Sequence, residues 1–253
     1  MSAPPPPTAA PGWYPDPWYP GMVRWFDGAV WTEHASYAGP VPGSTDTYDG
    51  DKGQSTARLA GFAFLARGAA AAFQAVAGAV LFSRVWDDFL EALDDPEQAS
   101  SGTFGSFTTL SLVSQALSLV GLAALIFVCI WTHRVVQNAR ALGMETTLSP
   151  NWSVAGWIIP FVSFVMPYLS VRDVFPEGSA GRRQVAIWWS CEIAGIVLSF
   201  AASVTALAGG SGPGVVVGSV AAVALLAAAV LGWRVAGAAA AAHARIAAGE
   251  QVT

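Results

Sequence analysis

Four long apolar runs constrain the fold of this chain more than any other feature. They cover approximately residues 60–83, 107–132, 185–208 and 214–236. Each is close to the ~20 residues that an α-helix needs to cross the hydrocarbon core of a bilayer. Only 11% of the 253 residues are charged, whereas soluble domains have about 25%. The sequence therefore predicts a mostly α-helical, multi-pass membrane protein with a four-helix transmembrane bundle embedded in the lipid bilayer.

A fifth apolar stretch, residues 151–170, is interrupted by Pro160 and Pro167. Each proline removes a backbone hydrogen-bond donor and clashes with the preceding helical turn. A helix over residues 151–159 would rise only ~14 Å, about half the thickness of the hydrocarbon core. We therefore expect a re-entrant or interfacial hairpin broken by proline, with a fifth span as the alternative.

Arginine placement favours the hairpin over a fifth span. If the N-terminus is cytoplasmic and residues 151–170 return to the side from which they came, Arg84 is the one arginine placed outside. The arginines then placed inside after the second span are Arg134, Arg140, Arg172, Arg182, Arg183, Arg234 and Arg245. A fifth span would move those from Arg172 onward outside, against the positive-inside bias. We predict a plasma-membrane protein with four spans and both termini cytoplasmic.

Arg67 and Glu192 are charged residues that fall well within apolar runs. Each lies about seven or eight residues from the cytoplasmic start of its span, at a depth of roughly 10–12 Å. An ion pair between the first and third spans would explain both charges. In the alternative, Arg67 extends back to the headgroups. The short side chain of Glu192 must then be protonated or face a wet cavity.

The N-terminal segment is of a different kind, because it concentrates tryptophan, tyrosine and proline. The β-prone runs 22–26 and 29–32 flank Asp27-Gly28, a pair that predicts a hairpin with a type I′ turn. Two strands alone are marginal, so we expect a further strand and an aromatic cluster. The sequence predicts a small WW-like β module over residues 12–36.

The rings of this module are candidates for binding a partner. We expect Trp13, Tyr14, Trp25 and Trp31 to bind a cytoplasmic protein or a proline-rich peptide, because aromatic platforms grip extended polyproline segments. The proline run at 4–7, within a proline-rich tail at 1–11, is a candidate tethered ligand. In the alternative, the rings form the module's own core.

The remaining boundaries follow from composition. Residues 37–57 are rich in Gly, Ser, Asp and Pro and predict a flexible linker. Residues 58–247 then form the membrane domain.

Three motifs in the N-terminal segment carry a family resemblance. They are Gly12-Trp13-Tyr14-Pro15-Asp16-Pro17, Arg24-Trp25-Phe26-Asp27-Gly28 and Trp31-Thr32-Glu33-His34. This pattern resembles the domain-of-unknown-function family 2510, a short domain at the ends of actinobacterial membrane proteins. The family has no assigned activity, so the resemblance implies a membrane setting and no particular reaction.

A second set of motifs spans about 40 residues around the predicted hairpin. It comprises Trp131, Arg134, Asn138, Ala139, Leu142, Gly143, Ser149, Pro150, Trp152, Gly156, Trp157, Pro160, Pro167 and Tyr168. The set resembles the domain-of-unknown-function family 4328, whose hydrophobic segments would account for roughly residues 57–245. The chain departs from that pattern at Ser163, where asparagine is expected, and at Phe175-Pro176, where the helix is expected to run on through an aromatic residue.

The polar members of the second set predict support for the broken backbone. Arg134 and Asn138 are four residues apart and share a helix face with each other, close to Trp131. We expect them to bond the carbonyls that Pro160 and Pro167 leave unpaired. In the alternative, the broken helices and Arg134 form a solute or ion site, as in several transporters.

Motifs of catalysis are lacking. The chain has no phosphate-binding loop, no dinucleotide-binding turn and no zinc-ligand spacing, and Cys129 and Cys191 lie in apolar runs typical of buried cysteines. We expect neither an enzyme nor a cofactor, metal or nucleic-acid partner. The preferred function is a membrane-anchored adaptor or sensor; the alternative is a small-solute or ion transporter or channel. Gly214 and Gly218 are four residues apart, a spacing that also occurs where membrane helices of two copies pair, so a homo-oligomer is a further alternative.

Overall fold

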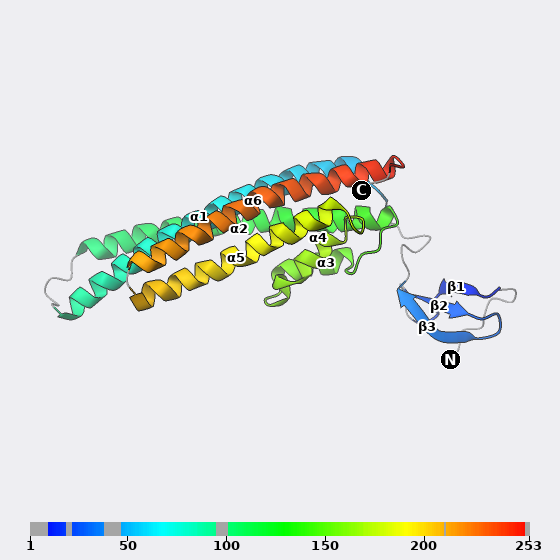
Figure 1. Cartoon of the computed structure of the whole chain (residues 1–253), viewed down its shortest axis with the longest axis horizontal. Coiled ribbons are helices and arrows are strands. Elements are labelled where there is room, and N and C mark those ends of the chain that lie inside the picture. Colours follow the sequence, from blue (N-terminus) through cyan, green and yellow to red (C-terminus); the bar gives the residue numbers. More distant parts are fainter. Residues whose placement is uncertain (1–9, 19–21, 38–46, 95–100, 210, 251–253) are drawn as a thin grey trace.

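The computed structural model describes residues 10–18, 22–37, 47–94, 101–209 and 211–250. Within these residues a small antiparallel sheet is followed by four long helices and a short, bent helical segment (Figure 1). The long helices lie side by side, and the bent segment lies at the end of the bundle where α1 starts and α6 finishes. The predicted fold class, a helical membrane bundle behind a β module, is confirmed.

The four long helices are α1 (Gly50–Asp94), α2 (Ser101–Ala141), α5 (Ala180–Gly209) and α6 (Ser211–Ala247). Each contains a stretch long and apolar enough to cross a membrane, and the stretches are Gly50–Leu81, Ser111–Ala141, Ala180–Ala206 and Gly212–Ala247. The four predicted spans are confirmed.

The start of α1 corrects the predicted linker. Helix α1 begins at Gly50, so residues 50–57 are helical rather than part of a linker over 37–57. The Asp49 side chain accepts a hydrogen bond from Lys52 N at 2.9 Å, as an N-cap residue does. The cap explains why a composition typical of a linker gives way to a helix here.

Small residues let the long helices approach closely. A Cβ placed on Gly68 of α1 would lie 2.3 Å from Ala229 Cβ of α6. Gly214 and Gly218 of α6 approach Ala206 of α5 and the α1 backbone. The glycine pair therefore serves packing within one chain, which weakens it as an indication of a homo-oligomer.

The proline-broken stretch forms α3 (Pro150–Ile158), η1 (Val162–Phe164) and α4 (Met166–Arg172). The second part bends by 107° from the first. Thr147 N, ahead of α3, donates to Asp173 Oδ2, beyond α4, at 2.9 Å. The two ends of the segment therefore meet, and the chain leaves the hairpin from the end at which it entered.

A cluster of aromatic rings joins this hairpin to the bundle. Trp188 packs against Phe64, Trp157 and Trp189, and Phe64 also packs against Trp131, with ring centroids between 5.4 and 6.4 Å apart. Trp131 and Trp188 are buried. The rings of the bundle and of the hairpin therefore belong to one buried cluster.

The N-terminal sheet has the strands β1 (Gly12–Pro15), β2 (Met22–Phe26) and β3 (Trp31–Tyr37) in the order β1-β2-β3. The hairpin and the additional strand are as predicted, but the two-residue type I′ turn is wrong. Phe26 pairs with Trp31, so the loop has four residues. Asp27 Oδ1 accepts hydrogen bonds from Val30 N at 2.7 Å and Ala29 N at 2.8 Å. These donors lower the pKa of Asp27 and stabilise the wider loop.

Candidate functional site

One face of the β module is its own core. Tyr14, Phe26 and Trp31 pack edge to face or tilted, with centroids 5.3–6.3 Å apart, and Trp18 packs against Trp31 at 6.4 Å. Phe26 is the most buried of these rings. Tyr14 and Trp31, two of the four predicted partner-binding residues, therefore belong to the aromatic core.

A buried ion pair completes this face. Arg24 Nη2 lies 2.9 Å from Asp16 Oδ2, and Arg24 Nη1 donates to Thr32 O at 2.9 Å. The guanidinium also lies over the Trp18 ring, 5.2 Å from its centroid. Arg24 thereby ties the segment after β1 to β3. Asp16 and Arg24 both belong to the N-terminal motifs quoted above. Membership of those motifs is the one sequence feature that points to the pair.

The other two predicted rings lie on the opposite face, since side chains alternate along a strand. Trp13 and Trp25 are cross-strand partners whose rings pack edge to face at 5.7 Å. The Trp13 side chain is 50% exposed, and Trp25 is half-buried. This tryptophan pair is an exposed aromatic surface of the module that its own core does not use. The proline run at 4–7 lies outside the described residues.

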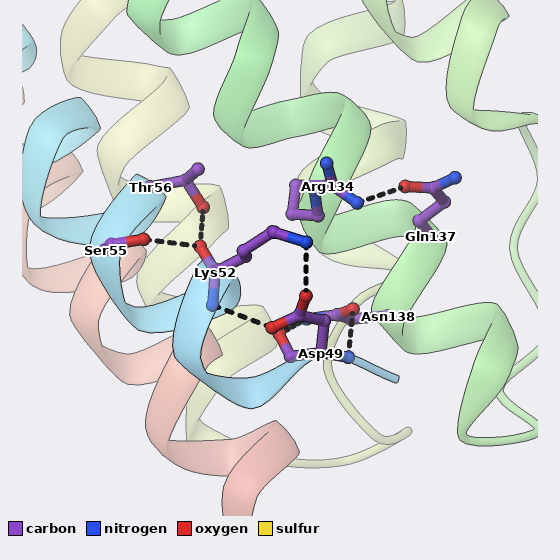
Figure 2. A network of polar contacts seen from close by, with 7 residues as sticks. All are labelled: Asp49, Lys52, Ser55, Thr56, Arg134, Gln137 and Asn138. Carbon is purple, nitrogen blue, oxygen red and sulfur yellow. Dashed lines mark hydrogen bonds and ion pairs between the residues drawn. The ribbon is translucent and has the colours of Figure 1, made fainter. Parts of the chain in front are cut away.

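The second site is the point where the chain enters the bundle. Asn138 of α2 binds both backbone groups of Asp49: its Oδ1 accepts from Asp49 N at 3.2 Å and its Nδ2 donates to Asp49 O at 3.1 Å (Figure 2). Asn138 is buried. A Cβ on Gly53 would lie 2.7 Å from Asn138 Nδ2, so the contact requires glycine there. We call this two-point contact the Asn138 clamp.

Charged groups surround the Asn138 clamp. Lys52 Nζ lies 3.0 Å from Asp49 Oδ2, and Arg134 donates to Gln137 Oε1 at 3.2 Å (Figure 2). The hydrogen bond from Lys52 N is the largest of several causes that lower the pKa of Asp49, and the Arg134 charge is a smaller one. An open cleft of about 470 Å³ is lined by Thr47, Tyr48, Asp49, Gly50, Asp51, Lys52, Arg134 and Gln137.

The predicted role of Arg134 and Asn138 at the proline break is therefore wrong. Both side chains face the start of α1, while the hairpin is held by tryptophans. Trp189 Nε1 donates to Phe164 O at 2.9 Å, and Trp157 Nε1 donates to Thr132 Oγ1 at 3.1 Å. An indole supplies a donor without bringing a charge into the apolar surroundings, which explains the difference.

The remaining residues of that predicted group have separate positions. Trp131 is buried against Phe64. Pro160 follows the end of α3, and Pro167 lies in the first turn of α4, where a missing N–H costs little. Proline thus defines the boundaries of the two short helices.

The intramembrane charges meet. Arg67 Nη1 and Glu192 Oε1 form an ion pair between α1 and α5. The Glu192 side chain is 8% exposed and that of Arg67 is 34% exposed. Each residue lies nine positions beyond an exposed arginine, Arg58 or Arg183, which corresponds to ~14 Å along the helix. The two charges therefore lie at matching positions along α1 and α5.

Comparison with known proteins identifies the chain at family level. The model of the domain of unknown function DUF4328 matches residues 99–248, and that of the protein of unknown function DUF2510 matches residues 11–44. No curated protein and no solved structure matches significantly. Because the first match covers more than half of the chain, this membrane protein belongs to the DUF4328 family and carries a DUF2510 module ahead of its membrane domain.

Proposed function

We propose that this protein is a membrane-anchored adaptor or sensor that binds a proline-rich segment of a partner through its β module. The observation that carries the proposal is the exposed Trp13–Trp25 pair. The module's core is complete without these two rings, because the opposite face packs Tyr14, Phe26 and Trp31. Two indoles inclined at 70° to each other offer flat surfaces against which proline rings pack.

The Asn138 clamp supports the membrane-coupled part of this proposal. The chain from the module reaches the bundle at Asp49, and both backbone groups of that residue are bound by α2. A partner on the module therefore acts on a chain whose end is fixed to two helices. A fixed chain end of this kind supports a module that is coupled to the bundle.

Binding is tested with the full chain in nanodiscs and a fluorescent decaproline peptide, followed by anisotropy. We expect saturable binding, weakened about tenfold or more in Trp13→Ala, since exposed tryptophans dominate such interfaces. Trp152→Ala is the matched control, because Trp152 is 56% exposed but lies outside the module. Binding that is absent, or equal in Trp13→Ala and the control, would overturn the proposal.

Orientation is a separate part of the proposal. We propose a plasma-membrane location with both termini cytoplasmic, supported by the exposed Arg58, Arg183 and Arg234 near one end of the bundle and the exposed Arg84 towards the other. In a cysteine-free background, a membrane-impermeant maleimide applied to intact cells should label Arg84→Cys and spare Val30→Cys. The reverse labelling would place the module outside.

A transport or channel role is the second candidate, and the Arg67–Glu192 pair is the observation that favours it. A carboxylate near the membrane centre is costly and is often a coupling site. Proteoliposomes loaded with pyranine would report proton entry. Under this reading, Glu192→Gln abolishes the flux and a chain lacking residues 1–37 retains it. A flux that depends on the module would contradict the transport reading.

A further inference from the structure

The apex of the helical hairpin exposes an unusual density of apolar side chains. Phe161 is 85% exposed, the largest exposed fraction of any large hydrophobic residue among the described residues. Ile158, Ile159, Phe164 and Val165 beside it are exposed too. These five apolar side chains are exposed within the eight residues of the apex of the hairpin, 158–165, where the one polar residue, Ser163, is half-buried.

The backbone at the apex is strained at the most exposed of these residues, Phe161. Phe161 has φ +65°, and it is the one non-glycine residue with a positive φ among those described. A side chain with a Cβ is strained in that conformation, and glycine would adopt it readily. A strained residue whose ring touches little of the protein indicates that the ring has a partner elsewhere.

The position of the apex along the bundle identifies that partner. Trp189 Nε1 donates to Phe164 O, which fixes the apex to α5 at this level. Trp189 lies six residues beyond the exposed Arg183, ~9 Å towards the Arg67–Glu192 pair. Ile187, on the same helix and 56% exposed, lies at a similar level. The apex is therefore at the depth of the acyl chains.

The base of the hairpin limits how far it can enter. Thr147 and Asp173 are hydrogen bonded, and α3 has nine residues, a rise of ~14 Å. The segment cannot reach the opposite face of a ~30 Å core and return within this length.

We infer that the apex of the hairpin is a lipid-binding wedge: residues 158–165 insert into the acyl chains of one leaflet, with Phe161 as the anchor, and do not pass the bilayer midplane. The partner is lipid hydrocarbon rather than a second copy of the chain. Transfer of the ring into hydrocarbon offsets the cost of the strained backbone at Phe161.

The test is site-directed spin labelling in nanodiscs of phosphatidylcholine and phosphatidylglycerol. Cys129 and Cys191, the free cysteines, are first replaced by alanine, and a nitroxide is attached at Phe161→Cys. Its collision rates with oxygen and with a water-soluble nickel chelate are measured. Ile187→Cys is the reference for lipid at this depth, and Val30→Cys in the β module is the reference for water.

We expect the label at 161 to resemble that at 187, with high oxygen and low nickel accessibility. Nickel accessibility like that at 30 would place the apex in water and overturn the inference. Low accessibility to both probes would show a protein contact, such as a second copy, and would also overturn it. Identical circular dichroism of the three labelled variants establishes that the fold is retained.

A second variant keeps the inference independent of the label. Phe161→Gly relieves the backbone strain and removes the anchor, whereas Phe161→Leu keeps an apolar side chain and the strain. With a nitroxide at Val165→Cys, we expect nickel accessibility to rise severalfold in the Phe161→Gly background and to change little in Phe161→Leu. Equal accessibility in both backgrounds would show that the ring does not hold the apex in lipid.

Discussion

Replacing the two intramembrane charges tests the energetics of the bundle most directly. Arg67→Met leaves the Glu192 carboxylate, which is 8% exposed, without a partner ~14 Å from the arginines at the membrane boundary. Breaking a buried pair in this way costs about 3–5 kcal/mol. Glu192→Met costs less, about 2–3 kcal/mol, because Arg67 is partly exposed and its long side chain relaxes towards the headgroups.

The double variant distinguishes a coupled pair from two independent residues. Arg67→Met with Glu192→Met leaves no buried charge, so its stability should lie within about 1 kcal/mol of the original or above it. The coupling energy is then at least about 4 kcal/mol, well above the ~0.5 kcal/mol of independent sites. The assay is SDS-induced unfolding in mixed micelles, followed by tryptophan fluorescence. Additive effects of the two substitutions would refute the pairing.

Three further predictions concern the module and the Asn138 clamp. Gly53→Ala places a methyl group 2.7 Å from Asn138 Nδ2, so amide exchange at Asp49 and the first turn of α1 should accelerate, and unchanged exchange would contradict the clamp. Trp31→Ala should abolish amide protection across β2 and β3, whereas Trp13→Ala should preserve it; equal loss would place both rings in the core. Because the folded-state pKa of Asp49 is lowered from 3.8, its stabilising effect is present above that value and is lost as pH falls through the lower folded pKa. Exchange in the first turn of α1 should therefore accelerate in that acidic range in the original chain and not in Asp49→Asn.

The spans and the hairpin could be predicted from the sequence because they depend on the length of each apolar run and on the lipid that surrounds it. A run of ~20 apolar residues has few alternatives to a membrane helix, and Pro160 marks the end of α3 through purely local sterics. The strands of the module could be predicted as well, since Asp27-Gly28 separates two β-prone runs.

The contacts between distant residues could not be predicted in the same way. Asn138 and Asp49 are 89 positions apart, and helical spacing fixes the face of α2 on which Asn138 lies but not the element opposite it. Trp13 and Trp31 are equally plausible as core or surface until strand register assigns their faces. The four-residue loop depends on the side chain of Asp27, which accepts hydrogen bonds from the loop backbone. These bonds compete with the preference of Asp27-Gly28 for a two-residue type I′ turn.

The continuity of α1 has a mechanical consequence. It is an unbroken helix of 45 residues, ~68 Å long, or about twice the thickness of the hydrocarbon core. The Asn138 clamp holds Asp49, the residue before its first turn, and the helix runs on to Asp94, beyond the apolar stretch Gly50–Leu81. Both hydrogen bonds of the clamp act on one residue, so a pull on the preceding chain loads them together. Because α6 packs against α1 at Gly68 and Ala75, such a load would reach the bundle through these contacts as well as through Asn138.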